Sequence, residues 1–520
     1  MTYLKNMTPQ RASLLLVGFM SLLHLFLAFT VELGGDEAHY ALYGLIPDWS
    51  YFDHPPMVGW LQIIPMWLAP YDWSARLVPI VLYGLLNALL YQVTVQLFCK
   101  KDFEQGGGSS KSILAEISSS ETSHWLGFWS LALLNTSLIL SLMGMAMLPD
   151  NPLMVVVLAL ILVVIKLLET EALKYWIALG LLVGLAALSK YTAVTLVLSL
   201  VLVMIAEKRW YWLTQKGLWI AILIATLLIT PVLYWNAQNE WASFLYQINH
   251  GTGSATWELD SLIRTQLTQL VSYTPAVFLL GWWAMLKPSN YQNRSSRLLL
   301  IFSLPITLLF AWGSGFEESL PHWVSLAWLL LIPIIVSWLW QRQNKKWFKP
   351  LLYLHLIVAG GLVLLAHSML YKPWISFDDH NNPIQGDYGW PQAAKTALEL
   401  QSSLTDDPKT LPLFVSNWSV TSHLAWYARP QPVFTTDPKQ TQYAFWIGLP
   451  KAGMNGLLVV PHYESVPPKT NTEYHFESCK ELKEESLSVN NAIVVTYRYY
   501  HCLNFLSKKQ PPALKTKVQH

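Results

Sequence analysis

Long apolar runs recur along the chain up to about residue 371, and they constrain the fold more than any other feature of the sequence. A helix needs about 20 apolar residues to cross a hydrocarbon layer about 30 Å thick. Only 13% of the 520 residues are charged, whereas about 25% are charged in a typical soluble domain. The sequence therefore predicts a mainly helical, polytopic membrane protein. We expect about eleven spans, near residues 12–31, 75–98, 125–146, 152–168, 174–189, 191–206, 218–236, 266–286, 298–313, 323–340 and 350–370.

Basic residues near the ends of these spans are concentrated on one side of the membrane. Seventeen lysines and arginines fall on that side, and only Arg76, Lys190 and Arg264 fall on the other. Because basic residues are retained on the cytoplasmic side, we expect a cytoplasmic N-terminus; the opposite side is called the outer side below. No small-residue cleavage site follows the first apolar run, so we expect a retained span and no removed signal peptide. Nothing in the sequence indicates nucleic-acid binding.

An acidic and aromatic loop follows the first span on the predicted outer side. Its sequence, residues 34–60, is GGDEAHYALYGLIPDWSYFDHPPMVGW, which contains four carboxylates and no lysine or arginine. An interfacial loop with a solvated acidic face and an aromatic belt is the simplest explanation of this composition. The spacing of the polar residues favours a functional site.

In a helix, Asp36, His39, Tyr40 and Tyr43 fall at i, i+3, i+4 and i+7 and therefore share one face. Glu37 points about 100° away from that face. We expect one carboxylate to face a pocket while its neighbour caps the helix or faces water.

A second acidic group in this loop, Asp53, is followed by His54, Pro55 and Pro56. The prolines end any helix and hold the preceding residues extended. Asp53 and His54 are candidate ligands for substrate, and also for a divalent cation, although two side chains alone do not make a metal site.

Further polar groups lie at span ends on the predicted outer side. Asp150, before Pro152, has the features of a helix N-cap, and it also brings a second carboxylate to the side that carries Asp36. Lys190 and its neighbour Tyr191 lie in a turn between two short spans, where a lysine often extends toward the interface.

Two more side chains on that side are candidates for binding an anion. Arg76 begins the second span, close behind the acidic loop, and His322 precedes a late span. His322 is more often a capped, satisfied histidine than a ligand in such a position. An anionic ligand on this side would have few other cationic partners.

The region after residue 371 has a different character, with more charge and no further spans. Short apolar or alternating runs predict strands, and residues 390–404 and 417–427 have helical periodicity. We therefore divide the chain into a transmembrane domain, 1–371, and an outer α/β domain, 372–520. The former contains an outer catalytic loop, 32–74, and a flexible cytoplasmic loop, 99–124. Cys479 and Cys502 would lie in an oxidising compartment, which predicts a disulfide.

These parts suit one kind of chemistry. A carboxylate can act as a general base toward a hydroxyl, aromatic side chains such as Tyr40 can stack on sugar rings, and cations can stabilise a departing phosphate. A lipid-linked sugar presents its phosphate at the depth of these loops.

The sequence also resembles a known family. The loop at 34–60, the DNP after the third span, LSKYTA at 188–193, WN at 235–236 and SNWSVTSHLAWYARPQPVF in the tail resemble the bacterial members of glycosyltransferase family 39. These are the protein O-mannosyltransferase-like enzymes, related to the lipid A aminoarabinose transferases. The resemblance covers most of the membrane region and, more weakly, the tail.

The resemblance implies a C-type membrane glycosyltransferase (GT-C) fold in a bacterial inner membrane. It implies a polyprenyl-phosphate sugar donor, a lipid, glycan or protein acceptor, and no required cofactor. It also implies that Asp36 is the general base and that Asp150 matches the acidic residue after the third span. Where the aminoarabinose transferases have an acidic-Lys-Pro-Pro motif, this chain has His54 after Asp53, which puts the phosphate-binding role of that motif in question.

We therefore name two groups of site residues. The candidate catalytic residues are Asp36, Glu37 and Asp150, and the candidate substrate-binding residues are Tyr40, Asp53, His54, Arg76, Lys190, Tyr191 and His322.

Other classes of function are alternatives. A secondary transporter or lipid flippase needs ionisable groups inside the spans, where the sequence places little besides His24, His355 and His367. An outer domain anchored by the spans would not need eleven of them. A polymer ligase that uses a diphosphate-linked glycan is the alternative within the enzyme class.

Overall fold

The computed structural model describes residues 7–99, 120–252, 256–375, 377, 382–436, 440–464 and 476–506. The chain divides into two compact units. The first unit consists of Met1–Phe26, His54–Val58 and Arg76–His367, and the second of Leu27–Asp53, Gly59–Ala75 and Ser368–His520.

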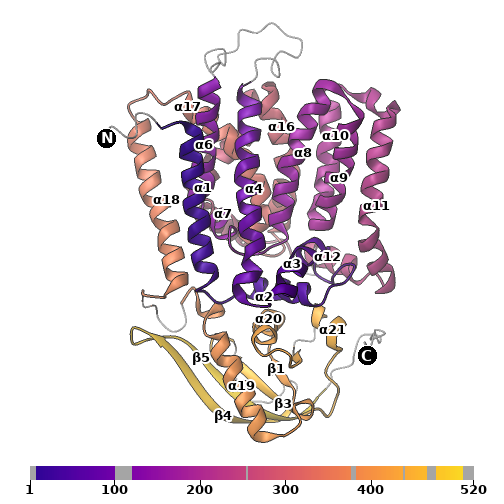
Figure 1. Ribbon diagram of the computed structural model, residues 1–520, viewed down its shortest axis with the longest axis vertical. Coiled ribbons are helices and arrows are strands. Elements are labelled where there is room, and N and C mark those ends of the chain that lie inside the picture. The colour runs from indigo at the N-terminus through magenta and orange to yellow at the C-terminus, as the bar shows by residue number, and fades with distance from the viewer. Residues whose placement is uncertain are drawn as a thin grey trace. The chain divides into compact units, whose positions relative to one another are not determined.

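The first unit is a set of long apolar helices that run side by side in Figure 1. Among the described residues of the whole chain, seven helices are long and apolar enough to cross a membrane, or eight if one bent pair counts as a span. The mainly helical, membrane-spanning architecture is thus as predicted. The predicted number of eleven spans is larger than the seven or eight described helices that are long and apolar enough to cross a membrane. The helices with residues in this unit are α1 (Pro9–Ala28), α4 (Asp72–Cys99), α6 (Ser120–Thr136), α7 (Leu138–Leu142), α8 (Asp150–Thr170), α9 (Leu173–Ser189), α10 (Val194–Ala206), α11 (Lys216–Gln238), α12 (Ala242–Thr252), α13 (Leu259–Ser272), α14 (Thr274–Leu286), α15 (Pro288–Gln292), α16 (Arg294–Gly313), α17 (Ser325–Trp340) and α18 (Phe348–Tyr371).

Two glycines allow α9 and α11 to approach closely. A Cβ atom on Gly180 would lie 2.5 Å from the carbonyl oxygen of Ala221, and one on Gly184 would lie 2.6 Å from a methyl group of Leu228. Small residues four apart on a membrane helix let a neighbouring backbone pack against them, because no side chain intervenes.

Two of the predicted spans differ from the structure. The predicted span 266–286 is two helices, α13 and α14, bent by 119°. Thr274 has a φ of 68° at this bend, and Pro275 follows it, so the residue before the proline cannot continue the helix. The predicted span 125–146 leaves helical geometry at Ser137, whose ψ is 122°.

The predicted cytoplasmic loop, 99–124, lies mostly outside the described residues. Its last five residues, 120–124, are already helical in α6, so the loop ends earlier than predicted.

The second unit is built on a five-stranded sheet with helices against it (Figure 1). The strand order is β2-β1-β3-β5-β4; β1 pairs parallel with β2 and β3, and the remaining pairs are antiparallel. Trp390, Leu424, Leu413, Val459 and Tyr497 belong to its core, which α19 and α20 share with the strands. The elements are α2 (Gly35–Leu45), α3 (Met57–Leu68, from residue 59), α19 (Trp390–Leu404), α20 (Trp418–Tyr427), α21 (Gln442–Ile447), β1 (Leu413–Val415), β2 (Val433–Thr435), β3 (Gly456–Pro461), β4 (Phe476–Val489) and β5 (Ala492–Phe505).

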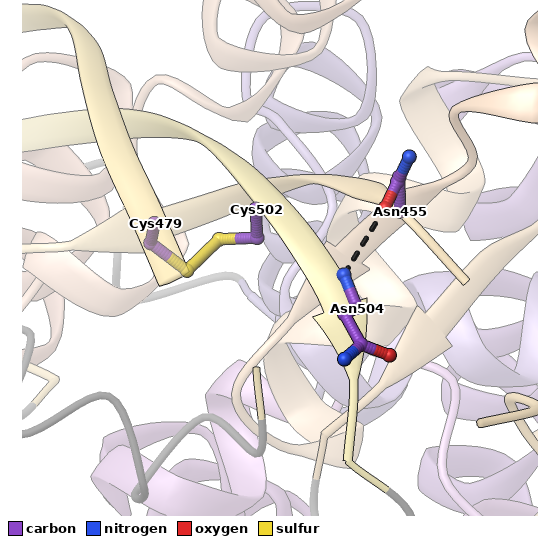
Figure 2. Close-up of a disulfide and its surroundings, with 4 residues drawn as sticks. All are labelled: Asn455, Cys479, Cys502 and Asn504. Atoms are coloured by element: carbon purple, nitrogen blue, oxygen red, sulfur yellow. Dashed lines mark hydrogen bonds between the residues drawn. A yellow bond between two sulfur atoms is a disulfide. The ribbon is translucent and has the colours of Figure 1, made fainter. Parts of the chain in front are cut away.

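The C-terminal part of this unit has the predicted α/β character, with one strand that the sequence pattern does not reveal. β4 is an edge strand that is largely exposed and rich in lysine and glutamate, so it lacks the apolar run that identifies a strand. Cys479 on β4 lies opposite Cys502 on β5, and the two form a disulfide (Figure 2). The domain boundary at residue 371 stays a prediction. Most of the first outer loop belongs to the same compact unit as residues 368–520.

Candidate active site

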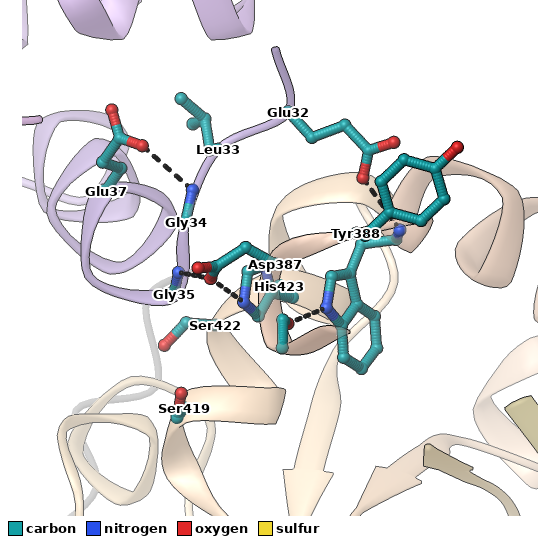
Figure 3. Close-up of polar contacts among 12 residues, drawn as sticks. Glu32, Leu33, Gly34, Gly35, Glu37, Asp387, Tyr388, Ser419, Ser422 and His423 are labelled. Carbon is teal, nitrogen blue, oxygen red and sulfur yellow. Dashed lines mark hydrogen bonds and ion pairs between the residues drawn. The ribbon is translucent and has the colours of Figure 1, made fainter. Parts of the chain in front are cut away.

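Helix α2 holds Asp36 in its first turn, and two acidic side chains fix the start of this helix. Gly34 is the N-cap and has no side chain to accept a hydrogen bond, so the Glu37 carboxylate reaches back to accept one from its backbone N–H at 3.0 Å. The Gly35 N–H donates to Oδ1 of Asp387 at 3.2 Å (Figure 3). Both contacts satisfy N–H groups that a helix start leaves free. Capping therefore accounts for the position of Glu37, which we had named as a candidate catalytic residue.

Asp36 itself is partly exposed. Within the described residues its carboxylate accepts no hydrogen bond, so both oxygens remain able to accept a proton. Burial in its surroundings raises the pKa of Asp36 to about 6; His39 opposes this rise, and the charges of Asp387, Asp53 and Glu37 add to it. A carboxylate with a pKa near the working pH is suited to general base catalysis.

His39 and Tyr43, on the predicted face of α2, are buried and hydrogen-bonded. Nε2 of His39 lies 2.9 Å from Oδ2 of Asp53, and the Tyr43 hydroxyl donates to the same oxygen at 3.0 Å. Nδ1 of His39 lies 3.4 Å from the hydroxyl groups of Tyr443 and Ser422. Asp53, predicted as a substrate or metal ligand, is thus used to position His39 and Tyr43.

Aromatic rings surround His39. Tyr40 packs on it with ring centroids 5.5 Å apart and Trp418 with centroids 5.6 Å apart. Tyr443 and Trp446 of the C-terminal region complete this group. Tyr40 is buried, whereas 40% of the surface of Trp418 is exposed. Trp418 is therefore the ring in this group that presents an open face to a ligand.

Asp387 and His423 are site residues that sequence reasoning missed. Nε2 of His423 lies 3.3 Å from Oδ1 of Asp387, the same oxygen that accepts the Gly35 N–H. His423 is buried and stacks on Trp390, with ring planes 4° apart. The string SNWSVTSHLAWYARPQPVF contains His423 and contributed to the family resemblance, but the resemblance implied no role for His423.

Two further carboxylates fasten the first outer loop to residues of the C-terminal region. The Glu32 carboxylate accepts hydrogen bonds from the N–H groups of Gly389 and Trp390 at 2.7 and 3.0 Å, at the start of α19. Asp72 accepts hydrogen bonds from the indole N–H of Trp426 and the hydroxyl of Tyr427, both at 2.7 Å. The loop that carries Asp36 is therefore held at both of its ends.

The other predicted site residues lie in the first unit. Asp150 and Lys190 form an ion pair, with Nζ 2.8 and 2.7 Å from the two carboxylate oxygens. These residues are only 2% and 6% exposed. A buried lysine needs such a partner, because desolvation of a lone charge is costly.

Tyr191, His322, Arg76 and His54 are in the same unit. The hydroxyl of Tyr191 shares a hydrogen bond of 2.7 Å with that of Ser243. His322 and His54 are partly exposed, and Arg76 is almost fully buried.

The metal site at Asp53 and His54 stays a prediction. Among the described residues, no three His, Cys, Asp or Glu side chains come together in a way that could hold a metal ion. We therefore assign no chemical step to a metal.

A polytopic helical unit with a small C-terminal α/β domain defines the class: the chain has the GT-C fold of membrane glycosyltransferases. Its fold is that of ArnT from Cupriavidus metallidurans. The apo structure of ArnT matches with a TM-score of 0.59 at 14% identity, and the structure bound to undecaprenyl phosphate matches with a TM-score of 0.59 at 15% identity. Each match covers 94% of this chain and 97% of ArnT.

Sequence comparisons agree with this class and confirm the resemblance to the mannosyltransferase-like enzymes. Residues 111–235 match the family of dolichyl-phosphate-mannose-protein mannosyltransferases. The chain is also 24% identical over 371 residues to the lipid A galacturonosyltransferase RgtD of Rhizobium johnstonii. This aligned segment covers 69% of this chain and 71% of RgtD.

Proposed function

We propose that the chain is a membrane glycosyltransferase that moves a sugar from a polyprenyl-phosphate donor to a lipid A-type glycolipid at the outer face of a bacterial inner membrane. The observation that carries this proposal is the Asp36 carboxylate, which is partly exposed, free of hydrogen bonds within the described residues and shifted to a pKa of about 6. The similarity to RgtD supports the acceptor class, and the fold shared with ArnT, solved with undecaprenyl phosphate, supports the donor class.

The proposed reaction is a single displacement. Asp36 takes the proton from an acceptor hydroxyl as the oxygen attacks the anomeric carbon. The bond to the polyprenyl phosphate breaks, and the phosphate leaves with the electron pair and without a proton. Attack and departure on opposite faces invert the anomeric configuration.

In this proposal other predicted site residues bind and orient the two substrates. Lys190, oriented by Asp150, holds the donor phosphate as its charge develops, together with Arg76 and His54. Trp418 contacts the sugar through its ring. An acceptor phosphate is already ionised and would need no base. A large loss of activity on removal of the Asp36 carboxylate therefore indicates a hydroxyl acceptor, and a small loss indicates a phosphate acceptor.

The test is transfer from radiolabelled polyprenyl-phosphate sugars into the lipid and protein fractions of membranes that contain the chain. Asp36→Asn keeps the shape of the side chain and removes the base, so we expect incorporation to fall by at least about 100-fold. Asp48→Asn, an exposed acidic residue of the same loop, is the matched control and should retain activity. Turnover near wild type in Asp36→Asn would refute the assignment of the base, and label found only in protein would refute the lipid acceptor.

A further inference from the structure

Two cations flank a pair of tryptophans, Trp283 and Trp338, that pack against each other at the ends of α14 and α17. Nζ of Lys287 lies 4.8 Å from the ring centroid of Trp283, and the guanidinium of Arg342 lies 4.1 Å from that of Trp338. The two rings lie 4.8 Å apart by their centroids. Lys287 and Arg342 are each only partly exposed. This arrangement holds two positive charges beside one aromatic surface.

The turn after α17 extends this surface. The N–H of Lys345 donates to the carbonyl of Arg342 at 2.9 Å, which closes the turn, and Trp347 packs on Trp338 with centroids 6.5 Å apart. Lys345, Lys346 and Lys349 are exposed beside it. The segment 341–349 contains no acidic residue, and neither does 287–297.

Other basic residues nearby in the sequence are neutralised. Arg294 and Arg297 each form an ion pair of 2.8 Å with Glu207. By contrast, no carboxylate of the described residues lies within ion-pair distance of Lys287, Arg342, Lys345, Lys346 or Lys349. The charge of this second group is thus left for a ligand outside the chain.

We propose that Lys287, Arg342, Trp283, Trp338 and Trp347, with the neighbouring lysines, form a binding site for the headgroup of an anionic phospholipid. The site lies at the ends of α17 and α18, which are long and apolar enough to span a membrane, and at the end of α14. Tryptophans at such helix ends lie at the level of the headgroups. Basic residues between helix ends bind anionic headgroups there. The inference goes beyond the proposed glycosyltransferase and does not depend on it.

The test is titration of the purified full-length chain with phosphatidylglycerol, followed by native mass spectrometry. Phosphatidylcholine with the same acyl chains and inorganic phosphate are the comparison ligands. The site variant is Lys287→Gln with Arg342→Gln, and the control variant is Lys208→Gln with Lys216→Gln, which removes the same charge from two exposed lysines. Equal melting temperatures in detergent show that both variants are folded.

We expect wild type to bind phosphatidylglycerol in preference to phosphatidylcholine. The site variant should lose about 30-fold in affinity, because each basic group near an anionic headgroup contributes roughly a factor of five, and the control variant should change little. Equal losses in the two variants, or no preference between the lipids, would overturn the site. Displacement of the lipid by inorganic phosphate alone would show a free-phosphate site and would also overturn the proposal.

Discussion

At the scale of single residues, the central feature is a carboxylate whose pKa is raised chiefly by burial, with smaller contributions from other carboxylates. Asp36 lies among Asp387, Asp53 and Glu37, whose charges raise its pKa, while His39 lowers it. Each of these three acids makes a contact of its own with a backbone N–H, a histidine or a tyrosine. The acidic neighbours are thus engaged in contacts, whereas the Asp36 carboxylate accepts no hydrogen bond from the described residues.

The pH dependence of activity should report this arrangement. If ionised Asp36 is the base, the rate should fall as the pH drops through about 6 and level off above about 7. Asp387→Asn removes a negative charge but keeps an oxygen that accepts the Gly35 N–H, so the pKa of Asp36 should fall and the acidic limb should move to lower pH. The measurement is the pH profile of the transfer rate for both proteins. An unchanged acidic limb in the variant would show that another group titrates.

The buried pair of Asp150 and Lys190 allows a second prediction at this scale. Lys190→Met leaves a buried carboxylate without its counter-ion, which should cost about 3–5 kcal/mol of stability. The double variant Asp150→Asn with Lys190→Met should recover most of the melting temperature in detergent. If Lys190 also holds the donor phosphate, this folded double variant should remain inactive. A single variant that melts like wild type would contradict the ion pair.

At the scale of elements, the loop that carries α2 is fastened to α19 and α20. Glu32 caps the start of α19, and Asp72 receives hydrogen bonds from Trp426 and Tyr427 of α20. The Tyr427 hydroxyl also accepts the N–H of Leu33 at 2.8 Å. One side chain of α20 thus joins the start of the loop to its end.

Removing this hydroxyl should loosen the start of α2. Tyr427→Phe deletes the acceptor for Leu33 and a donor to Asp72, at a cost of about 1 to 3 kcal/mol. Amide hydrogen exchange should therefore speed up over residues 33–45. Tyr353→Phe, at an exposed tyrosine of α18, is the control. Identical exchange in the two variants would mean that the hydroxyl does not hold the loop.

At the scale of the whole molecule, the chain combines a helical membrane unit with a unit that carries the candidate base. The concentration of basic residues on one side predicts a cytoplasmic N-terminus and an outer C-terminal domain. A green fluorescent protein fused at the N-terminus should therefore fluoresce, and alkaline phosphatase fused after residue 506 should be active. The reverse result for both reporters would invert the orientation and place the Asp36 loop in the cytoplasm.

Much of the fold and part of the site followed from local patterns. Apolar length identified the helices, because a long hydrophobic run has few other stable states in a membrane. The spacing of Asp36, His39 and Tyr43 placed them on one helical turn, since this depends only on the helical repeat. The bend between α13 and α14 was missed because composition does not record the direction in which a helix runs.

The class of protein, the helical membrane unit and the place of Asp36 on its helix followed from the sequence, because each depends on residues close together in the chain. Which groups lie around Asp36 depended on the folded chain. Gly35 and Asp387 are 352 residues apart in the chain, and no periodicity links them. Asp387 contacts His423 of α20, and α20 packs against α2; that packing depends on side-chain shapes along both helices at once. Glu37 and Asp53, which the local pattern marks as equals of Asp36, are by contrast held within the loop itself, by the Gly34 N–H and by His39.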